Sequence, residues 1–337
     1  MTAATTRTRT RLADQLLPRE VTSWVRAMAW ASLLTNALLI VSGGAVRLTG
    51  SGLGCPTWPR CTDDSWTNTP AMGIHGYIEF GNRTLTFLLA LVAVLTALAV
   101  WRLRDRHPSF LRIAVALGVG IVVQAVVGGV TVRTGLNPWV VGIHFVISAV
   151  LVALAAVLVD RTRRVSLRHV AVAERGGQLT GPEARGARVL AVVLGVCAGL
   201  AIYLGTLVTG TGPHSGDAGG VARHTFDAYL VARVHAVPVY VLVAGTGVGV
   251  VAAFVRGWPG ALRRILVALA VVVAAQAAIG YYQYFNGVPI LAVALHMVGA
   301  AVLATVATMV VEKTYAVSAR RDEPLAPGPS SDVLTRT

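Results

Sequence analysis

Charged residues are scarce in this chain: they make up 13% of its 337 residues, whereas hydrophobic residues make up 55%. Soluble domains carry about 25% charge, so the composition excludes an ordinary soluble fold. Eight apolar runs are long enough to cross a bilayer core of roughly 30 Å, at approximately 27–47, 75–101, 111–132, 139–159, 189–209, 230–254, 265–285 and 289–311. The runs are continuous and do not alternate with polar residues, so they predict an all-α integral membrane protein, an eight-transmembrane-helix bundle.

Cysteine is nearly absent, with three residues in the chain. Cys55 and Cys61 flank the segment PTWPR between the first two predicted spans, where an oxidising compartment favours a disulfide between them. Two cysteines with no histidine nearby make a poor zinc site. Cys197 lies within the fifth run, and we expect it to be a small core residue.

Positive charge is abundant, with a formal net charge of +14, but its distribution follows the membrane. If the N-terminus is cytoplasmic, 23 of the 29 Lys and Arg residues fall on cytoplasmic segments. The other six lie in or near the outer loops, at Arg47, Arg60, Arg83, Arg133, Arg223 and Arg233. This bias predicts a multi-pass protein of the cell membrane with both termini cytoplasmic, and it argues against nucleic acid as a partner. Residues 1–26 lack the apolar segment of a cleavable signal peptide, so we expect the first span to anchor the chain.

Two residue pairs recur at a constant offset. Gln124 precedes His144 by twenty residues, Gln276 precedes His296 by the same interval, and the two pairs are 152 residues apart. This duplication predicts two similar four-helix halves of the same orientation. The expected division is a cytoplasmic N-terminal segment 1–26, a first half 27–159, a cytoplasmic linker 160–188, a second half 189–312 and a disordered cytoplasmic tail 313–337.

Four histidines lie near the outer ends of the even-numbered spans: His75, His144, His235 and His296. Ionisable residues within a bilayer are costly and usually functional, and imidazoles at matching depth on neighbouring helices favour axial ligation of two hemes. A single such histidine could instead hydrogen-bond a carbonyl. The remaining histidines lie in predicted loops and are expected to be solvated: His107, His169, His214 and His224.

The stretch IHGYIEFGNRTLT places His75, Glu79 and Asn82 on one helix face, with Arg83 beside them. Glu79 could form an ion pair that locks helices together, or it could serve as a general base or water-positioning carboxylate beside a cofactor. We prefer the second interpretation because the histidines cluster at the same depth. Three arginines near the outer surface are candidate propionate contacts: Arg47, Arg83 and Arg233.

Three features together resemble the heme A synthase family, membrane enzymes that convert heme O to heme A for cytochrome oxidase. They are the segment GGAVRLTGSGLGCPTWPRC, the motif E-x-x-[HN]-R at Glu79 to Arg83, and the histidines of the fourth, sixth and eighth spans. The resemblance covers about residues 28–312, and it implies an eight-helix bundle of two four-helix halves.

The resemblance also implies a division of work between the halves. The second half would hold a heme b cofactor whose iron is ligated by His235 and His296, and the first half would bind the substrate heme with His144 as an iron ligand. Glu79 would be the catalytic carboxylate. The implied oxidoreductase takes a heme methyl to a formyl by two hydroxylations with water-derived oxygen, and an external membrane acceptor receives the electrons.

The chain departs from the family pattern at the iron-ligand position of the second span. That position, usually histidine in E-x-x-H-R, is Asn82 here, and an amide is a poor iron ligand. Either His75 takes part, which we favour slightly, or the substrate iron has His144 as its one protein ligand. Internal alignment leaves the choice open, because an offset of 160 pairs His235 with His75 whereas an offset of 152 pairs it with Arg83, beside Asn82.

A second departure concerns cysteine. The Cys55–Cys61 pair matches the family's disulfide, but the loop after the fifth span, PHSGDAGGVARHTFD, has none. A mechanism that needs cysteines in both halves is therefore not expected here.

Two other functions compete with this one. A di-heme b-type electron-transfer cytochrome would explain the histidines but leave Glu79 without a role, and a heme transporter would more often show helices broken at the midplane. The expected partners of a synthase are heme O, a heme O synthase, a membrane electron acceptor and the lipid bilayer. A homo-oligomer is one candidate assembly of the chain.

Overall fold

The computed structural model describes residues 14–168, 178–214, 216–217 and 220–318. Within them, eight helices are long and apolar enough to cross a membrane. They are α2 (Ser23–Leu48), α3 (Gly73–Trp101), α4 (Pro108–Arg133), α5 (Pro138–Arg168), α6 (Gly181–Thr211), α7 (Ala228–Val255), α8 (Gly260–Phe285) and α9 (Ile290–Ser318). The prediction of an all-α, eight-helix membrane protein is confirmed, and the chain is a multi-pass membrane protein.

Several helices continue beyond the apolar runs on the side where α5 and α9 end. Residues 160–168 and 181–188, expected in a linker, are helical, and so are residues 313–318, expected in a disordered tail. Ion pairs between α5 and α9 favour this extension, since they give the charged side chains partners. The remainder of both segments, 169–177 and 319–337, lies outside the described residues.

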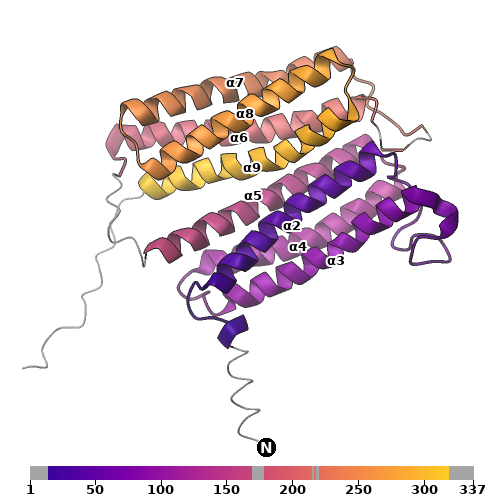
Figure 1. The fold of residues 1–337 in the computed structure, drawn as a ribbon, viewed down its shortest axis with the longest axis horizontal. Coiled ribbons are helices and arrows are strands. Elements are labelled where there is room, and N and C mark those ends of the chain that lie inside the picture. Colours follow the sequence, from indigo (N-terminus) through magenta and orange to yellow (C-terminus); the bar gives the residue numbers. More distant parts are fainter. Residues whose placement is uncertain (1–13, 169–177, 215, 218–219, 319–337) are drawn as a thin grey trace, which may run out of the picture.

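The helices form two rings of four (Figure 1). In the first ring α2 and α4 each pack against α3 and α5, and in the second α6 and α8 each pack against α7 and α9. Helices α3 and α5 therefore lie diagonally across the first ring, and α7 and α9 lie diagonally across the second. These four helices carry the predicted heme-ligating histidines.

The internal repeat extends to backbone conformation. Gly135 and Leu136, which join α4 to α5, both have φ of 59°, and Gly287 and Val288, which join α8 to α9, have φ of 67° and 59°. A positive φ is unusual for any non-glycine residue and especially for β-branched valine. Because the two turns are separated by the same 152 positions as the Gln–His pairs, these helix pairs are connected in the same way in both halves.

The halves meet along a seam in which α5 packs against α6 and α9, and α2 packs against α9. At its charged end, Lys313 donates to Asp160 at 2.7 Å and Arg161 donates to Glu312 at 2.7 Å. Arg164 joins both carboxylates, at 2.9 Å from Asp160 and 2.6 Å from Glu312. The Asp160 side chain is only 1% exposed, so these partners offset the cost of burying its charge.

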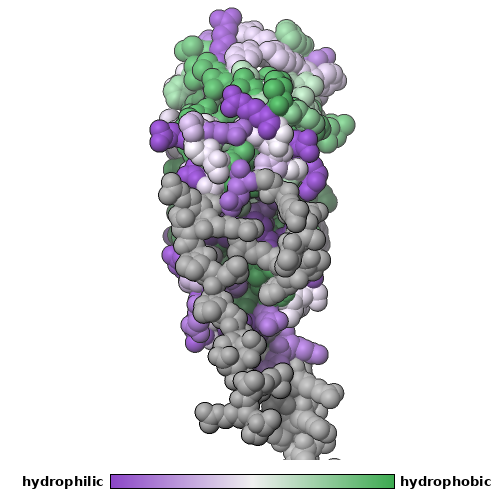
Figure 2. Space-filling view, turned by 90° about the vertical axis from the view of Figure 1, so that its left-hand side faces the viewer, coloured by the Kyte–Doolittle hydropathy of each residue, from purple (hydrophilic) through white to green (hydrophobic). Residues whose placement is uncertain are grey.

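This end of the bundle carries many hydrophilic residues. Figure 2 views it face on and shows hydrophilic side chains across it, with apolar residues toward the helices of the second half. The opposite end carries the loop 49–72, in which the next residues of interest lie (Figure 1).

Candidate functional site

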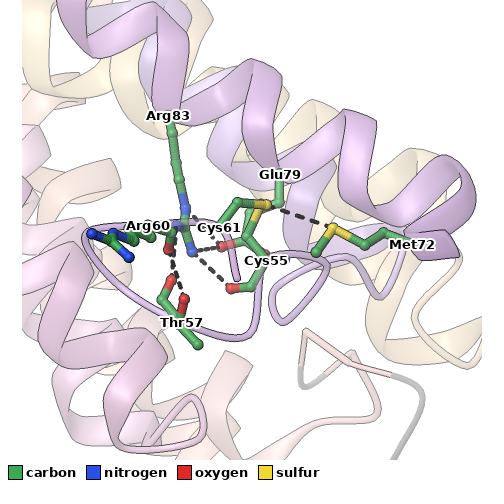
Figure 3. Close-up of polar contacts among 7 residues, drawn as sticks. All are labelled: Cys55, Thr57, Arg60, Cys61, Met72, Glu79 and Arg83. Carbon is green, nitrogen blue, oxygen red and sulfur yellow. Dashed lines mark hydrogen bonds and ion pairs between the residues drawn. A yellow bond between two sulfur atoms is a disulfide. The ribbon is translucent and has the colours of Figure 1, made fainter. Parts of the chain in front are cut away.

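Glu79 is the seventh residue of α3, at the end of its second turn, and is only 4% exposed. Its Oε2 accepts a hydrogen bond from the Cys55 backbone N–H at 2.6 Å, and its Oε1 accepts from Arg83 Nε and Nη2 at 3.1 and 2.6 Å. Figure 3 shows the carboxylate between the α3 arginine and the loop. The spacing of four residues places Glu79 and Arg83 on one helix face, so the helix itself brings the ion pair together.

Arg83 extends from this ion pair into the loop (Figure 3). Its guanidinium donates to the carbonyl oxygens of Cys55 at 2.8 Å, Thr57 at 2.9 Å and Arg60 at 3.2 Å, in addition to Glu79. A guanidinium has five N–H donors, and these contacts use all of them. Arg83 therefore has no donor left for a heme propionate in this conformation, and its visible role is to hold the loop.

Cys55 and Cys61 form a disulfide, as predicted. The two residues are 0% and 1% exposed, so the bond lies beneath the loop and does not face solvent. The sulfur of Met72 lies 3.6 Å from Cys61 Sγ. Cys197 is free and buried in the packing of the second half, which agrees with its expected core position.

The same loop covers the outer end of α4. Arg133 Nη2 donates to the Trp58 carbonyl at 3.0 Å, and its guanidinium lies 5.7 Å from the centre of the Trp58 ring. The Trp58 ring packs directly on Gly129, where a side chain would overlap it. The loop 49–72 is thus fixed to two helices of the first half, by polar contacts on α3 and by an aromatic contact on α4.

Three of the predicted ligands share one local environment, in which the imidazole packs against a glycine of the preceding helix. A Cβ added to Gly128 of α4 would lie 3.3 Å from His144 Cε1, and one added to Gly280 of α8 would lie 3.7 Å from His296 Cε1. The third pair is on α6 and α7, where a Cβ on Gly205 would lie 3.3 Å from His235 Cε1. The glycines make room for the rings, and these pairs recur through both halves.

The three imidazoles also share an unsatisfied nitrogen. Within the described residues, Nδ1 of His144, His235 and His296 is buried and makes no hydrogen bond of ordinary geometry, although the His235 ring interacts with the backbone of Ala201. Buried polar atoms usually have partners, so each such atom needs an explanation. A ring nitrogen without a hydrogen bond is available to ligate a metal, and these residues therefore fit a heme.

His235 and His296 face the same interior. They lie on the diagonal helices α7 and α9, and each ring packs against a glycine of the helix before its own, Gly205 of α6 and Gly280 of α8. Imidazoles from opposite helices of a four-helix ring can approach a planar ligand from both sides.

Residues 26–215, more than half of the chain, match the family of cytochrome oxidase assembly proteins, COX15-CtaA. The chain belongs to this family. The match includes α2 to α6 with Glu79 and His144, and it ends before α7, so His235 and His296 lie outside it.

Curated relatives of this family member are named heme A synthase. The protein from Geobacillus kaustophilus (strain HTA426) is 32% identical over 140 residues, which are 40% of this chain and 42% of the relative. The protein from Listeria monocytogenes serovar 1/2a is 25% identical over 182 residues, which are 52% of this chain and 56% of the relative. The matched region thus spans about half the length of these relatives.

In this cytochrome oxidase assembly protein, the two candidates for the fourth ligand lie in different surroundings. His75 is exposed, and its Nδ1 is 2.9 Å from Ser51 Oγ in the loop. Asn82 lies deeper in α3, and its Oδ1 accepts a hydrogen bond from Ser42 Oγ of α2 at 2.7 Å. His75 therefore contacts the loop, whereas Asn82 contacts a neighbouring helix.

Two further arginines were proposed as propionate contacts. Arg47 Nη2 donates to the Thr209 carbonyl at 2.9 Å across the seam between the halves, while its Nε is buried without a hydrogen-bond partner among the described residues. Arg233 is exposed at the outer end of α7. The unsatisfied donor makes Arg47 the more suitable anion partner of the two.

His224 corrects the expectation that the loop histidines are solvated. It is 8% exposed and packs between Trp139, at 4.5 Å between ring centroids, and Phe226, at 5.2 Å. Burial, and secondarily the charge of Arg47, lower the pKa of His224 below its usual value. His214 is also engaged, since its Nε2 lies 2.9 Å from the Val288 carbonyl oxygen. His169 lies outside the described residues.

Sequence analysis missed Ser42 and the residues that surround the first loop. Nothing in the local sequence distinguishes Ser42 from other residues of a membrane helix, and only its contact with Asn82 identifies it. Trp58 and Gly129 likewise meet through tertiary packing alone.

Proposed function

We propose that this protein is a heme A synthase, an oxidoreductase that converts a methyl group of heme O to a formyl group for cytochrome oxidase. One observation carries the proposal: the glycine-packed imidazoles of α5, α7 and α9 recur through both halves, whereas among the described residues a buried carboxylate at the corresponding level, Glu79, occurs in the first half alone. Ligand positions in both halves and a reactive carboxylate in one are what a synthase needs.

His235 and His296 would hold a heme b cofactor between α7 and α9. Such a heme supplies one-electron redox chemistry, tuned by its axial ligands and their surroundings. His144 would ligate the iron of the substrate, heme O, in the first half. Arg47, with its unsatisfied Nε, would bind a propionate, and the exposed Arg233 is a second candidate for this role.

Glu79 would act on the substrate as a general base or by positioning a water molecule. Each hydroxylation of the methyl group consumes a water and releases two electrons and two protons, and loss of water from the second product leaves the formyl group. Because Arg83 and the Cys55 N–H hold the Glu79 carboxylate in one orientation, this group is preorganised to accept such a proton.

The cellular setting is part of the proposal. The excess of Lys and Arg on one side supports an orientation in which both termini would be cytoplasmic and the loop 49–72 would lie outside the cell membrane, which suits the formation of its disulfide. A heme O synthase would supply the substrate, and a membrane acceptor would take the electrons. The structure describes one chain, and a homo-oligomer remains a separate prediction.

A di-heme b-type electron-transfer cytochrome is the second candidate, and one observation favours it. Glu79 has a structural task, because it anchors Arg83 and the loop that carries the disulfide. An electron-transfer protein therefore no longer leaves this carboxylate unexplained, as it did from the sequence.

Extraction and chromatography of the hemes from purified protein tests both functions. The full chain is co-expressed with a heme O synthase, and a synthase is expected to yield heme A together with heme B. Heme B alone, with heme O accumulating in the membrane, would instead support the electron-transfer cytochrome. A colourless preparation would contradict both functions.

A further inference from the structure

The helices follow one another in pairs, in which one helix crosses the membrane and the next returns: α2–α3, α4–α5, α6–α7 and α8–α9. Each pair has one contact between its two helices at the same depth along the helix axes, which we call the same level. Gly128 and Gly280 lie five residues before the ends of α4 and α8, at Arg133 and Phe285, and Gly205 lies six residues before Thr211, the end of α6. These three glycines receive the imidazoles of His144, His296 and His235. The level is therefore a property of the repeated helix pair.

The fourth pair, α2 and α3, has its contact at this level between Ser42 and Asn82. Ser42 lies six residues before Leu48, where α2 ends, which is the distance that separates Gly205 from the end of α6. The Ser42 hydroxyl donates to Asn82 Oδ1 at 2.7 Å. Measured from the end of the preceding helix, Asn82 thus lies at the level in the first half that His235 occupies in the second.

His75 lies outside this level. It is the third residue of α3 and Asn82 is the tenth, whereas His144, His235 and His296 are the seventh, eighth and seventh residues of their helices, so Asn82 lies two or three positions from their level and His75 four or five. Its partner Ser51 lies three residues beyond the end of α2. At 1.5 Å per residue, the four or five positions that separate His75 from the other histidines correspond to roughly 6–8 Å along the helix axis.

We propose that the iron bound in the first half has His144 as its one protein ligand, and that Asn82, held by Ser42, leaves the opposite coordination position open. The proposal rests on the proposed function, since it requires a heme in the first half. With Oδ1 accepting from Ser42, the other polar group of the Asn82 amide is its Nδ2, which carries N–H donors, and an N–H donor does not ligate iron. The second half, with imidazoles on both diagonal helices, closes both positions.

The spin state and carbon monoxide binding of the two hemes test this inference without reference to turnover. The purified full chain, loaded by co-expression with a heme O synthase, is studied by electron paramagnetic resonance and by the difference spectrum of the reduced protein with carbon monoxide. We expect one low-spin heme that excludes carbon monoxide and one high-spin heme that binds it. His144→Ala should remove the second signal and retain the first.

Two variants sharpen the result. Ser42→Gly combined with Asn82→His recreates the glycine–histidine pair, so it should convert the high-spin heme to low spin and abolish carbon monoxide binding. His75→Ala and Asn82→Ala should leave the high-spin heme unchanged. The low-spin heme of the second half reports folding in every variant, so a misfolded double variant is recognised and the single variants decide.

The contrary outcomes are distinct. Two low-spin hemes in the unmodified protein, one of which becomes high-spin in His75→Ala or Asn82→Ala, would overturn the inference and leave the proposed function intact. A well-folded double variant whose heme stays high-spin would overturn the register argument. A protein with no His144-dependent heme would overturn both the inference and the proposed function.

Discussion

The two halves of the bundle share a helix arrangement but differ around α3 and α7. When Asn82 is set against His235, the positions of Glu79 and Arg83 fall on Ala232 and Ala236. The first half thus has a carboxylate and a guanidinium where the second has methyl groups. The comparison teaches that one helix arrangement can serve two tasks: under the proposed function, the symmetric half would close both sides of a heme and the altered half would provide reactive groups.

The outer loops differ in the same sense. The loop 49–72 is fixed by a buried disulfide and by the Glu79–Arg83 pair. The described parts of the loop after α6 depend on packing, in which His224 lies between Trp139 and Phe226 and its backbone N–H donates to Gly210 at 3.0 Å. The first half therefore has the more strongly fixed cover over its outer end.

The largest expected effect is loss of the heme of the second half. His235→Ala or His296→Ala should abolish the low-spin heme b spectrum, because each variant removes one of the two imidazoles expected to ligate the same heme iron. Absorbance difference spectra of the purified protein measure this, with His107→Ala as a matched histidine control. A wild-type spectrum in both variants would remove the cofactor assignment.

Loss of the Glu79 carboxylate should have the opposite effect: it should impair the reaction in the first half and leave the heme of the second half bound. Glu79→Gln keeps an acceptor for the Cys55 N–H but loses the charge, so heme A formation should fall by roughly 100-fold or more while heme b is retained. Extracted hemes provide the measurement. Arg83→Ala is the control for loop anchoring, and an equal loss of product in that variant would show that Glu79 acts through the loop and not on the substrate.

The seam between the halves should respond to the loss of one charge. Lys313→Met leaves the buried Asp160 with Arg164 as its remaining ion-pair partner, so it should lower the free energy of unfolding by roughly 1–3 kcal/mol. Lys313→Arg should retain most of that stability. Thermal unfolding in detergent measures both variants, and an unchanged midpoint for Lys313→Met would show that the pair contributes little.

The glycine contacts predict a smaller and selective effect. Gly205→Ala would place a Cβ 3.3 Å from His235 and so should shift the ring, whereas Gly280→Ala would place one at an ordinary 3.7 Å from His296. We expect a shift in the heme b absorption maximum or redox potential for the first variant and none for the second. Equal responses would contradict the packing argument.

The smallest effect concerns pH. His224 is buried with a lowered pKa, so the folded loop favours the neutral ring, and an opened loop takes up a proton below a pH of about 6.5. The stability of this loop should therefore be unaffected above that pH and should decrease as the pH falls below it. Hydrogen exchange of residues 220–227 measures this stability. His224→Phe should abolish the pH dependence, and the disulfide-bonded loop 49–72 should show no such pH dependence in the unmodified protein.

Much of the architecture could be predicted from sequence because long apolar runs and a 152-residue offset are simple linear signals. The sequence could not show whether His75 or Asn82 lies at the depth of the other candidate ligands, since outer loops of different length give two internal offsets. Only the contacts of Ser42 with Asn82 and of Ser51 with His75 distinguish the two residues. Burial of His224 was also hidden, because Trp139 is brought to it from the first half of the chain by tertiary packing.

Other contacts had a signal that was available in the sequence. Asp160 and Glu312 are separated by 152 positions, as are Arg161 and Lys313, so the repeat predicts that two acidic–basic pairs occupy equivalent places. The additional contacts of Glu79 and Arg83 are different, because the Cys55 N–H and the loop carbonyls are backbone groups without a residue-specific signature.

The ion pairs of the seam have a consequence for recognition between the halves. Asp160 pairs with Lys313, and the equivalent residues in the repeat, Glu312 and Arg161, pair in return. This reciprocity is the contact pattern of a twofold homodimer, in which each partner presents the same surface. Each half thus carries the complement of its own surface, and an unduplicated four-helix chain with this acidic–basic pair could assemble with a copy of itself without any covalent connection.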